Sequence, residues 1–208
     1  TELMYRHWND WRGDKRSHLF LLDLNDKSVK DLTPAYTQDV PPIALGSAND
    51  YAISPEGDEI AFTMNPDKNL AISTNNEVYI AKINDLLTGK KSLLKKISVG
   101  LGNDNQPVYS PDGKYIAFCS MERPGYEADK LRIMLYDRKT GTLKSLTDKY
   151  DLSAAEVIWS PDSKTIYFNA ANEINESVYS LDINTGVLTT ILKEKVNTNI
   201  LISTDNKT

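Results

Sequence analysis

Short apolar segments separated by turn sequences alternate along this chain. Three of them share a pattern of apolar residues that ends in phenylalanine: residues 59–62 (EIAF), 115–118 (YIAF) and 165–168 (TIYF). Each follows a turn sequence that begins with Ser-Pro, at residues 54–57 (SPEG), 110–113 (SPDG) and 160–163 (SPDS). Proline fixes φ, an acidic side chain can bond its own backbone, and glycine accepts positive φ, so these residues predict a tight turn leading into a half-buried strand.

A second repeated pattern predicts a β-hairpin later in each unit. Residues 135–143 (LYDRKTGTL) and 180–188 (SLDINTGVL) alternate on either side of a central Thr-Gly, which suits a hairpin turn. An earlier copy lies at residues 22–29 (LDLNDKSV), and another begins at residues 78–83 (VYIAKI) with a longer turn through Asn84 to Lys91. Each repeating unit is therefore predicted to contain four antiparallel strands and almost no helix.

The spacing of the repeats predicts the blades of a β-propeller. The three Ser-Pro turns and a decayed fourth copy at residues 203–206 (STDN) are 56, 50 and 43 residues apart, and such a period is typical of propeller blades. We expect an all-β fold, a partial β-propeller in one domain over residues 1–208. Its complete blades are predicted at residues 34–97, 98–147 and 148–192, with partial blades at 1–33 and 193–208.

Three complete blades and two partial ones cannot close into a ring. Propellers typically close with about four to eight blades, and closure hides the strand edges. The chain opens at Thr1 without a methionine and stops where a further blade is due. We therefore expect a piece of a larger protein, with exposed radial edges that favour self-association.

Composition and charge limit the kinds of molecule that this chain is expected to bind. A net charge of −5, with basic and acidic residues mixed along the chain, leaves no basic stripe for nucleic acid. No run of 18 apolar residues and no apolar leader are present, so the sequence predicts neither a membrane span nor an export signal. The single Cys119 excludes an internal disulfide and is expected to be a packed or half-buried thiol.

The chain lacks the motifs of a catalytic or cofactor site. It contains no G-x-S-x-G, H-E-x-x-H, C-x-x-C or P-loop, and residues 103–105 (NDN) lack the glycine and glutamate of a calcium loop. His18 precedes an apolar strand and is expected to be packed or at a strand edge. Trp159 takes the place of Tyr109 before a Ser-Pro turn and is expected in the core. Trp8 and Trp11 precede the truncated first blade, where packing on further blades or on another domain is open to them. We predict no catalytic residue, no metal and no cofactor.

The repeats carry a family resemblance. Residues 110–118 (SPDGKYIAF) resemble the WD40-like Pro-Asp repeats shared by TolB-like propellers and by the propellers of prolyl oligopeptidase family serine peptidases. Residues 8–20 (WNDWRGDKRSHLF) and 121–130 (MERPGYEADK), the latter followed by Leu-Tyr-Asp, resemble segments of the dipeptidyl peptidase 5 subgroup. The resemblance covers the whole chain.

This resemblance implies a parent enzyme in which an N-terminal propeller caps a C-terminal α/β-hydrolase domain. The parent would be a serine-type dipeptidyl or acylaminoacyl peptidase, and it would be periplasmic or secreted. The hydrolase domain is absent from residues 1–208, so this chain is expected to have no peptidase activity of its own.

Residues 122–130 interrupt the repeat and are the predicted substrate-binding site. An enzyme that removes dipeptides must recognise the free ammonium group of its substrate, which a carboxylate can do by a charge-assisted hydrogen bond. The resemblance implies that a propeller loop facing the hydrolase supplies this group. Glu122 and Arg123 are the first candidates, for the amine and for a peptide carbonyl, followed by Glu127 and Tyr126. The alternative is a solvated charged loop with weak ion pairs.

Two other functions fit the repeats without the peptidase resemblance. One is a TolB-like propeller that binds a protein partner, and the other is a scaffold with no enzymatic context. Sequence beyond Thr208 would separate them, because further blades followed by G-x-S-x-G would establish the peptidase.

Overall fold

The computed structural model describes residues 15–88 and 94–203 as four antiparallel β-sheets. A two-stranded sheet comes first, formed by β1 (Phe20–Leu22) and β2 (Val29–Asp31). The next sheet contains β3 (Tyr51–Ile53), β4 (Glu59–Met64), β5 (Glu77–Lys82) and β6 (Lys95–Lys96). Two more follow, with β7 (Asp104–Tyr109), β8 (Tyr115–Ser120), β9 (Arg132–Asp137) and β10 (Leu143–Ser145), then β11 (Ala154–Trp159), β12 (Thr165–Asn172), β13 (Asn175–Asp182) and β14 (Leu188–Leu192).

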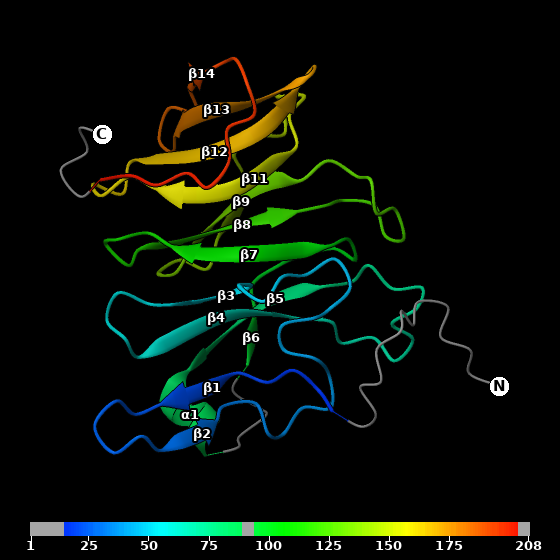
Figure 1. Cartoon of the computed structure of the whole chain (residues 1–208), viewed down its shortest axis with the longest axis vertical. Helices are drawn as coiled ribbons and strands as arrows, with labels where there is room; N and C mark the ends of the chain where they lie inside the picture. Colours follow the sequence, from blue (N-terminus) through cyan, green and yellow to red (C-terminus); the bar gives the residue numbers. More distant parts are fainter. Residues whose placement is uncertain (1–14, 89–93, 204–208) are drawn as a thin grey trace.

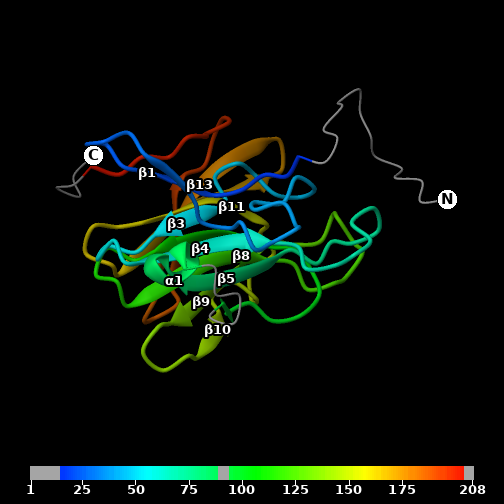
Figure 2. The ribbon, with the colours of Figure 1, turned by 90° about the horizontal axis from the view of Figure 1, so that it is seen from below.

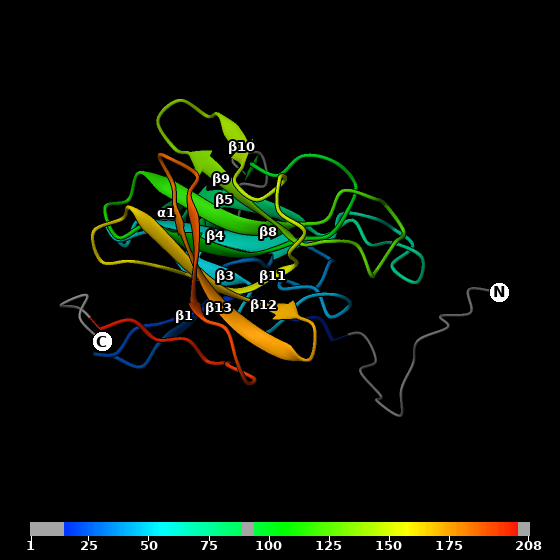
Figure 3. The same cartoon turned by 90° about the horizontal axis from the view of Figure 1, so that it is seen from above.

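Each four-stranded sheet is a meander of strands that are consecutive in sequence. The sheets follow one another along the long axis of the molecule in chain order (Figure 1). Seen along that axis, β10 lies at the rim, with β9 and β8 further inward (Figures 2 and 3). The predicted all-β fold, with three four-stranded units and a partial one, is confirmed. The helix α1 (Ile83–Leu87) occupies part of the longer turn expected after residue 83.

The Ser-Pro turns form as the sequence predicts. Gly57 and Gly113 have φ of 76° and 69°, and Ser163 takes the same place with φ of 61°. In the second and third copies the aspartate, Asp112 or Asp162, accepts a hydrogen bond from the turn serine at 2.7 Å and from the amide two residues later at 3.1 Å. The acidic residue therefore closes the turn, and all three turns lie at the same end of the sheets (Figure 1).

The sheets pack face to face, and the second and third strands of each four-stranded unit contain most of its buried residues. In β8, Ile116 and Phe118 join a core cluster with the preceding sheet, whereas Ala117 and Cys119 join a cluster with the following one. Trp159 is 8% exposed in that second cluster, which confirms its predicted core position. Cys119 is fully buried, and burial raises the pKa of its thiol to about 12.

A repeated hydrogen-bond pattern fixes where the chain leaves one sheet for the next. The third strand of a unit donates an amide to a hydroxyl that follows the fourth strand, in the pairs Leu19–Thr33 (3.2 Å), Val78–Ser98 (3.0 Å) and Ile133–Thr147 (2.9 Å). A few residues later the chain bonds back to the same strand, through Val40–Ser17, Asp104–Asn76 and Ala154–Leu131. The amide of Asn197 bonds to the carbonyl of Glu176 in the same way, at 3.2 Å.

A partly buried charge cluster joins the second and third sheets. The guanidinium of Arg138, whose side chain is 18% exposed, donates to Glu59 Oε1 at 3.0 and 3.1 Å and to the carbonyl oxygen of Gly113. Tyr109 donates its hydroxyl to the same Glu59 oxygen at 3.0 Å, and its ring lies 5.1 Å from the guanidinium. Loss of the Arg138 guanidinium would leave the mostly buried Glu59 carboxylate without its closest opposite charge, which is energetically unfavourable.

We predict that Arg138→Ala lowers the free energy of unfolding by about 2–3 kcal/mol, because breaking a shielded ion pair costs more than a surface pair. Lys114→Ala is the matched control, since Lys114 forms an exposed pair with Asp112, and should change stability by less than about 0.5 kcal/mol. Urea unfolding measures both. Equal effects of the two substitutions would contradict this role of Arg138.

Candidate functional site

The predicted site, residues 122–130, lies at the end of the sheets opposite to the Ser-Pro turns (Figure 1). It connects β8 to β9 and adjoins the loop that connects β4 to β5, since the amide of Gly125 donates to Thr74 Oγ1 at 2.8 Å. Gly125 has φ of 72°, a conformation that glycine adopts at little cost. The site is therefore a loop held between two neighbouring sheets.

Asp129 holds the loop together from within. Its Oδ2 accepts the amides of Glu122 and Arg123 at 2.9 and 2.8 Å, and its Oδ1 accepts Arg123 Nε and Nη2 at 3.0 and 2.7 Å. The Arg123 guanidinium and these amides hold the pKa of Asp129 well below its usual range. Because this carboxylate near the end of the loop binds residues 122 and 123 at its beginning, the predicted site has a defined shape. Sequence reasoning named Arg123 but did not find its partner.

The structure brings two of the predicted site residues, Arg123 and Tyr126, into contact. The guanidinium of Arg123 lies over the ring of Tyr126, 4.1 Å from its centre, and Tyr126 is 46% exposed. Glu122 is exposed and points its Oε2 towards Arg132 Nη1, at 3.3 Å. Glu127 is also exposed. The loop thus presents carboxylates and an aromatic face to solvent, with one arginine neutralised by Asp129.

A layer of buried polar side chains lies beneath the loop. The amide of Met121 donates to the carbonyl of Asn103 at 2.9 Å, and a side chain at Gly102 would collide with the carbonyl of Met121. Asn103 Oδ1 accepts Asn76 Nδ2 at 2.8 Å, which ties the second sheet to the third. The segment 103–105, which lacks a calcium-loop pattern, therefore supports the loop from below.

Asp104 in this layer is a buried carboxylate that sequence reasoning missed. It is 1% exposed, and neither of its oxygens accepts a hydrogen bond of ordinary geometry among the described residues. Burial raises its pKa to about 7; nearby Glu77 adds to this, while the hydroxyls of Ser120 and Ser98 and the charge of Arg132 act in the opposite direction. A buried acid with such a pKa changes charge near neutral pH.

We predict that this carboxyl makes the chain less stable as pH rises. Its pKa is about 7 in the folded state against an ordinary value of 3.8, so its contribution to stability is complete below about pH 4 and is lost as pH rises through about 7. Asp104→Asn should remove this part of the pH dependence, an effect on the order of 3 kcal/mol between pH 4 and 8.

Urea unfolding at several pH values tests this, with the exposed Asp151→Asn as the control variant. If the stability of Asp104→Asn falls with pH as steeply as that of the unaltered chain, then Asp104 is not the group that titrates.

Other chemistry-bearing residues have structural roles. His18 Nδ1 lies 2.7 Å from Asp31 Oδ2, next to β1, so His18 is a strand-edge residue as expected. Trp8 and Trp11 lie outside the described residues. Within residues 15–88 and 94–203, no group of three or more His, Cys, Asp and Glu side chains can hold a metal ion, and no helix is long and apolar enough to cross a membrane.

The stacked four-stranded sheets define the class, a stretch of β-propeller built from Ser-Pro-Asp repeats. The structure resembles that of TolB from Acinetobacter baumannii, with a TM-score of 0.59 and 24% identity, over 84% of this chain and 37% of that one. At this identity the likeness shows a shared fold. No protein-family model matches the chain.

The chain is homologous to the dipeptidyl-peptidases 5. It is 34% identical over 192 residues to dipeptidyl-peptidase 5 of Porphyromonas gingivalis, covering 89% of this chain and 27% of the relative. It is 35% identical over 188 residues to that of Porphyromonas endodontalis, covering 88% and 26%. The chain thus spans about a quarter of the length of these relatives. Over nearly all of its own length the chain is thus similar to one part of these relatives, which agrees with the resemblance predicted from the sequence.

Proposed function

We propose that this propeller region belongs to a serine peptidase that cleaves dipeptides from the N-termini of oligopeptides. In this proposal the region gates access to a separate α/β-hydrolase domain, its partner in the same protein. The support is the homology to two dipeptidyl-peptidases 5 along nearly the whole chain. The chain itself contains no G-x-S-x-G, so the nucleophile would come from that other domain.

We further propose that residues 122–130 bind the substrate N-terminus. The observation that supports this is the fixed backbone of an acidic loop: Asp129 binds the amides of residues 122 and 123, and the exposed Glu122 carboxylate lies 3.3 Å from Arg132 Nη1. A carboxylate fixed in this way can accept a charge-assisted hydrogen bond from a substrate ammonium group. Glu127 adds negative charge to the same loop, which attracts the same cation.

Arg123 and Tyr126 then contact the substrate backbone. Asp129 uses Nε and Nη2 of Arg123, so Nη1 can donate to the first peptide carbonyl oxygen. The ring of Tyr126 packs beneath the guanidinium and restricts its orientation. A rigid donor and a rigid acceptor separated along one loop would measure the distance from the substrate ammonium to the first carbonyl, which is what removal of two residues requires.

We predict that Glu122→Gln and Arg123→Ala in the full-length protein each lower kcat/KM for a dipeptidyl substrate by roughly tenfold or more. The loss should fall mainly on KM if the contacts are equal in the ground and transition states. Steady-state kinetics with a chromogenic dipeptide substrate measures it.

Glu56→Gln serves as the control, because it makes the same charge change at the opposite end of the sheets, in a Ser-Pro turn. Unchanged kinetics in both loop variants would overturn the site assignment. The alternative, a TolB-like role in protein binding, is supported only by the shared fold. It predicts that the full-length protein has no peptidase activity.

A further inference from the structure

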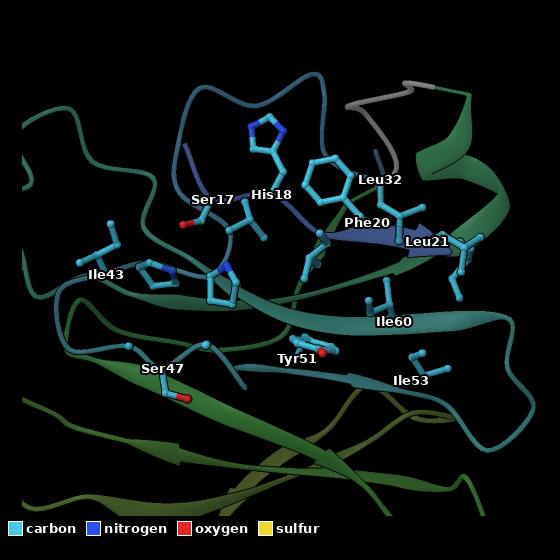
Figure 4. A pocket seen from close by; sticks show the side chains of 17 residues that line it. Ser17, His18, Phe20, Leu21, Leu32, Ile43, Ser47, Tyr51, Ile53 and Ile60 are labelled. Carbon is cyan, nitrogen blue, oxygen red and sulfur yellow. The ribbon is translucent and has the colours of Figure 1, made fainter. Parts of the chain in front are cut away.

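An apolar groove of about 530 Å³ lies between β1 and the sheet that follows it (Figure 4). Leu21, Ile53 and Ile60 line it, and no aspartate or glutamate is among its lining residues. An ammonium group is recognised through charge-assisted hydrogen bonds to a carboxylate, so this groove lacks the group that the proposed substrate needs. Further determinants of ammonium recognition are therefore expected around the Glu122 carboxylate.

The Glu122 carboxylate is exposed and has one anchor among the described residues. Its side chain is 76% exposed, and its Oε2 accepts a hydrogen bond from Arg132 Nη1 at 3.3 Å. Asp129 fixes the backbone amide of residue 122, but that contact does not restrain the glutamate side chain, which is long and flexible. An exposed glutamate that becomes ordered only on binding loses conformational entropy. The contact with Arg132 restrains the side chain beforehand.

Arg132 is held more firmly than the glutamate that it contacts. Its side chain is 18% exposed, and its Nη1 also lies 3.5 Å from Asp148 Oδ1. On the sheet, Ser120 pairs with Arg132 on one side and with Asp104 on the other, so the three side chains lie in a row on one face. Burial raises the pKa of Asp104, and the charge of Arg132 acts in the opposite direction. Groups outside the loop thus keep the guanidinium in place.

We propose that Arg132 is a positioning residue for Glu122 in the recognition of the substrate ammonium group. This inference rests on the proposed function of residues 122–130. The guanidinium binds Oε2 of Glu122 and so limits the directions in which the carboxylate presents its other oxygen, Oε1, to the substrate. A guanidinium suits this role because its several donors can serve two carboxylates at once. Arg132 acts through Glu122 and does not itself contact the substrate.

Two effects of Arg132 on substrate binding have opposite signs. Its positive charge repels the substrate ammonium group, so charge alone predicts that removal of Arg132 lowers KM. Its hydrogen bond orders Glu122, so positioning predicts that removal of Arg132 raises KM. Water and salt screen charges at an exposed rim, whereas a released side chain must be ordered anew at each binding event. We therefore expect the positioning effect to be the larger.

Steady-state kinetics of the full-length protein with a chromogenic dipeptide substrate tests the proposal. The variants are Arg132→Gln, Arg132→Lys, Glu122→Gln and the double variant Glu122→Gln with Arg132→Gln. Lys149→Gln is the matched control, because it removes the same charge from an exposed side chain that directly follows Asp148. Urea unfolding of each variant shows whether it is folded in the assay.

We expect Arg132→Gln to raise KM by roughly fivefold with little change in kcat, because it removes an ordering contact and no group that touches the reacting atoms. Arg132→Lys keeps a charged donor and should raise KM by less than about twofold. In the Glu122→Gln background, the added Arg132→Gln should change KM by less than about twofold, since the carboxylate that Arg132 positions is already absent. Lys149→Gln should leave KM unchanged.

An unchanged or lower KM in Arg132→Gln would overturn the inference, because the guanidinium would then be idle or merely repel the substrate. An equal rise in KM with and without Glu122, or an equal rise in Lys149→Gln, would overturn it too, because the effect would not pass through Glu122. If Arg132→Gln does not fold, Arg132→Lys decides, and a rise in KM as large as that of Glu122→Gln would contradict positioning.

The same measurements separate this inference from the proposed function on which it rests. Unchanged kinetics in Glu122→Gln would overturn the proposed role of Glu122 and the inference with it. Impaired kinetics in Glu122→Gln together with an unchanged KM in Arg132→Gln would overturn the inference alone.

Discussion

The fold depends on the burial of both faces of each sheet. In β8 alternate residues face opposite neighbours: Phe118 packs towards the preceding sheet and Cys119 towards the following one, and both are fully buried. An isolated four-stranded sheet would expose both of these faces to water, so each unit depends on its neighbours for stability. Because the strands of each sheet form an antiparallel meander, the connections between them lie at the two ends of the strands. The Ser-Pro turns join the first and second strands, and residues 122–130 join the second and third, so the two kinds of connection lie at opposite ends (Figure 1).

The parts of the fold that repeat in sequence were predictable because they rest on local chemistry. Asp112 closes its turn with groups two residues away, and the strand that follows it shows its apolar pattern directly. The connecting hydroxyls, such as Ser98, were missed because their partners lie about 20 residues away and no local pattern shows them. For the candidate site, the loop could be found as an interruption of the repeat. The role of Asp129 inside it, and of Asp104 beneath it, required the folded arrangement.

The candidate site combines a rigid loop with a polar support. The Asp129 carboxylate is mostly shielded and compensates the charge of the Arg123 guanidinium, so the exposed negative charges of the loop are those of Glu122 and Glu127. Beneath the loop, Asp104 is enclosed between two sheets in the same layer as the amide pair of Asn76 and Asn103. A loop that is fixed before the substrate arrives loses little conformational entropy on binding, which favours tight recognition of a small group. Such an arrangement is what the proposed role in substrate recognition requires.

The most direct test of this account compares a dipeptidyl substrate that has a free N-terminus with its N-acetylated form. In the full-length protein, kcat/KM should be much higher for the free amine, and Glu122→Gln should reduce that preference by roughly tenfold, because the amide cannot pair with an ammonium charge. A preference that stays the same in Glu122→Gln would contradict the account, since the ammonium group would then be recognised elsewhere.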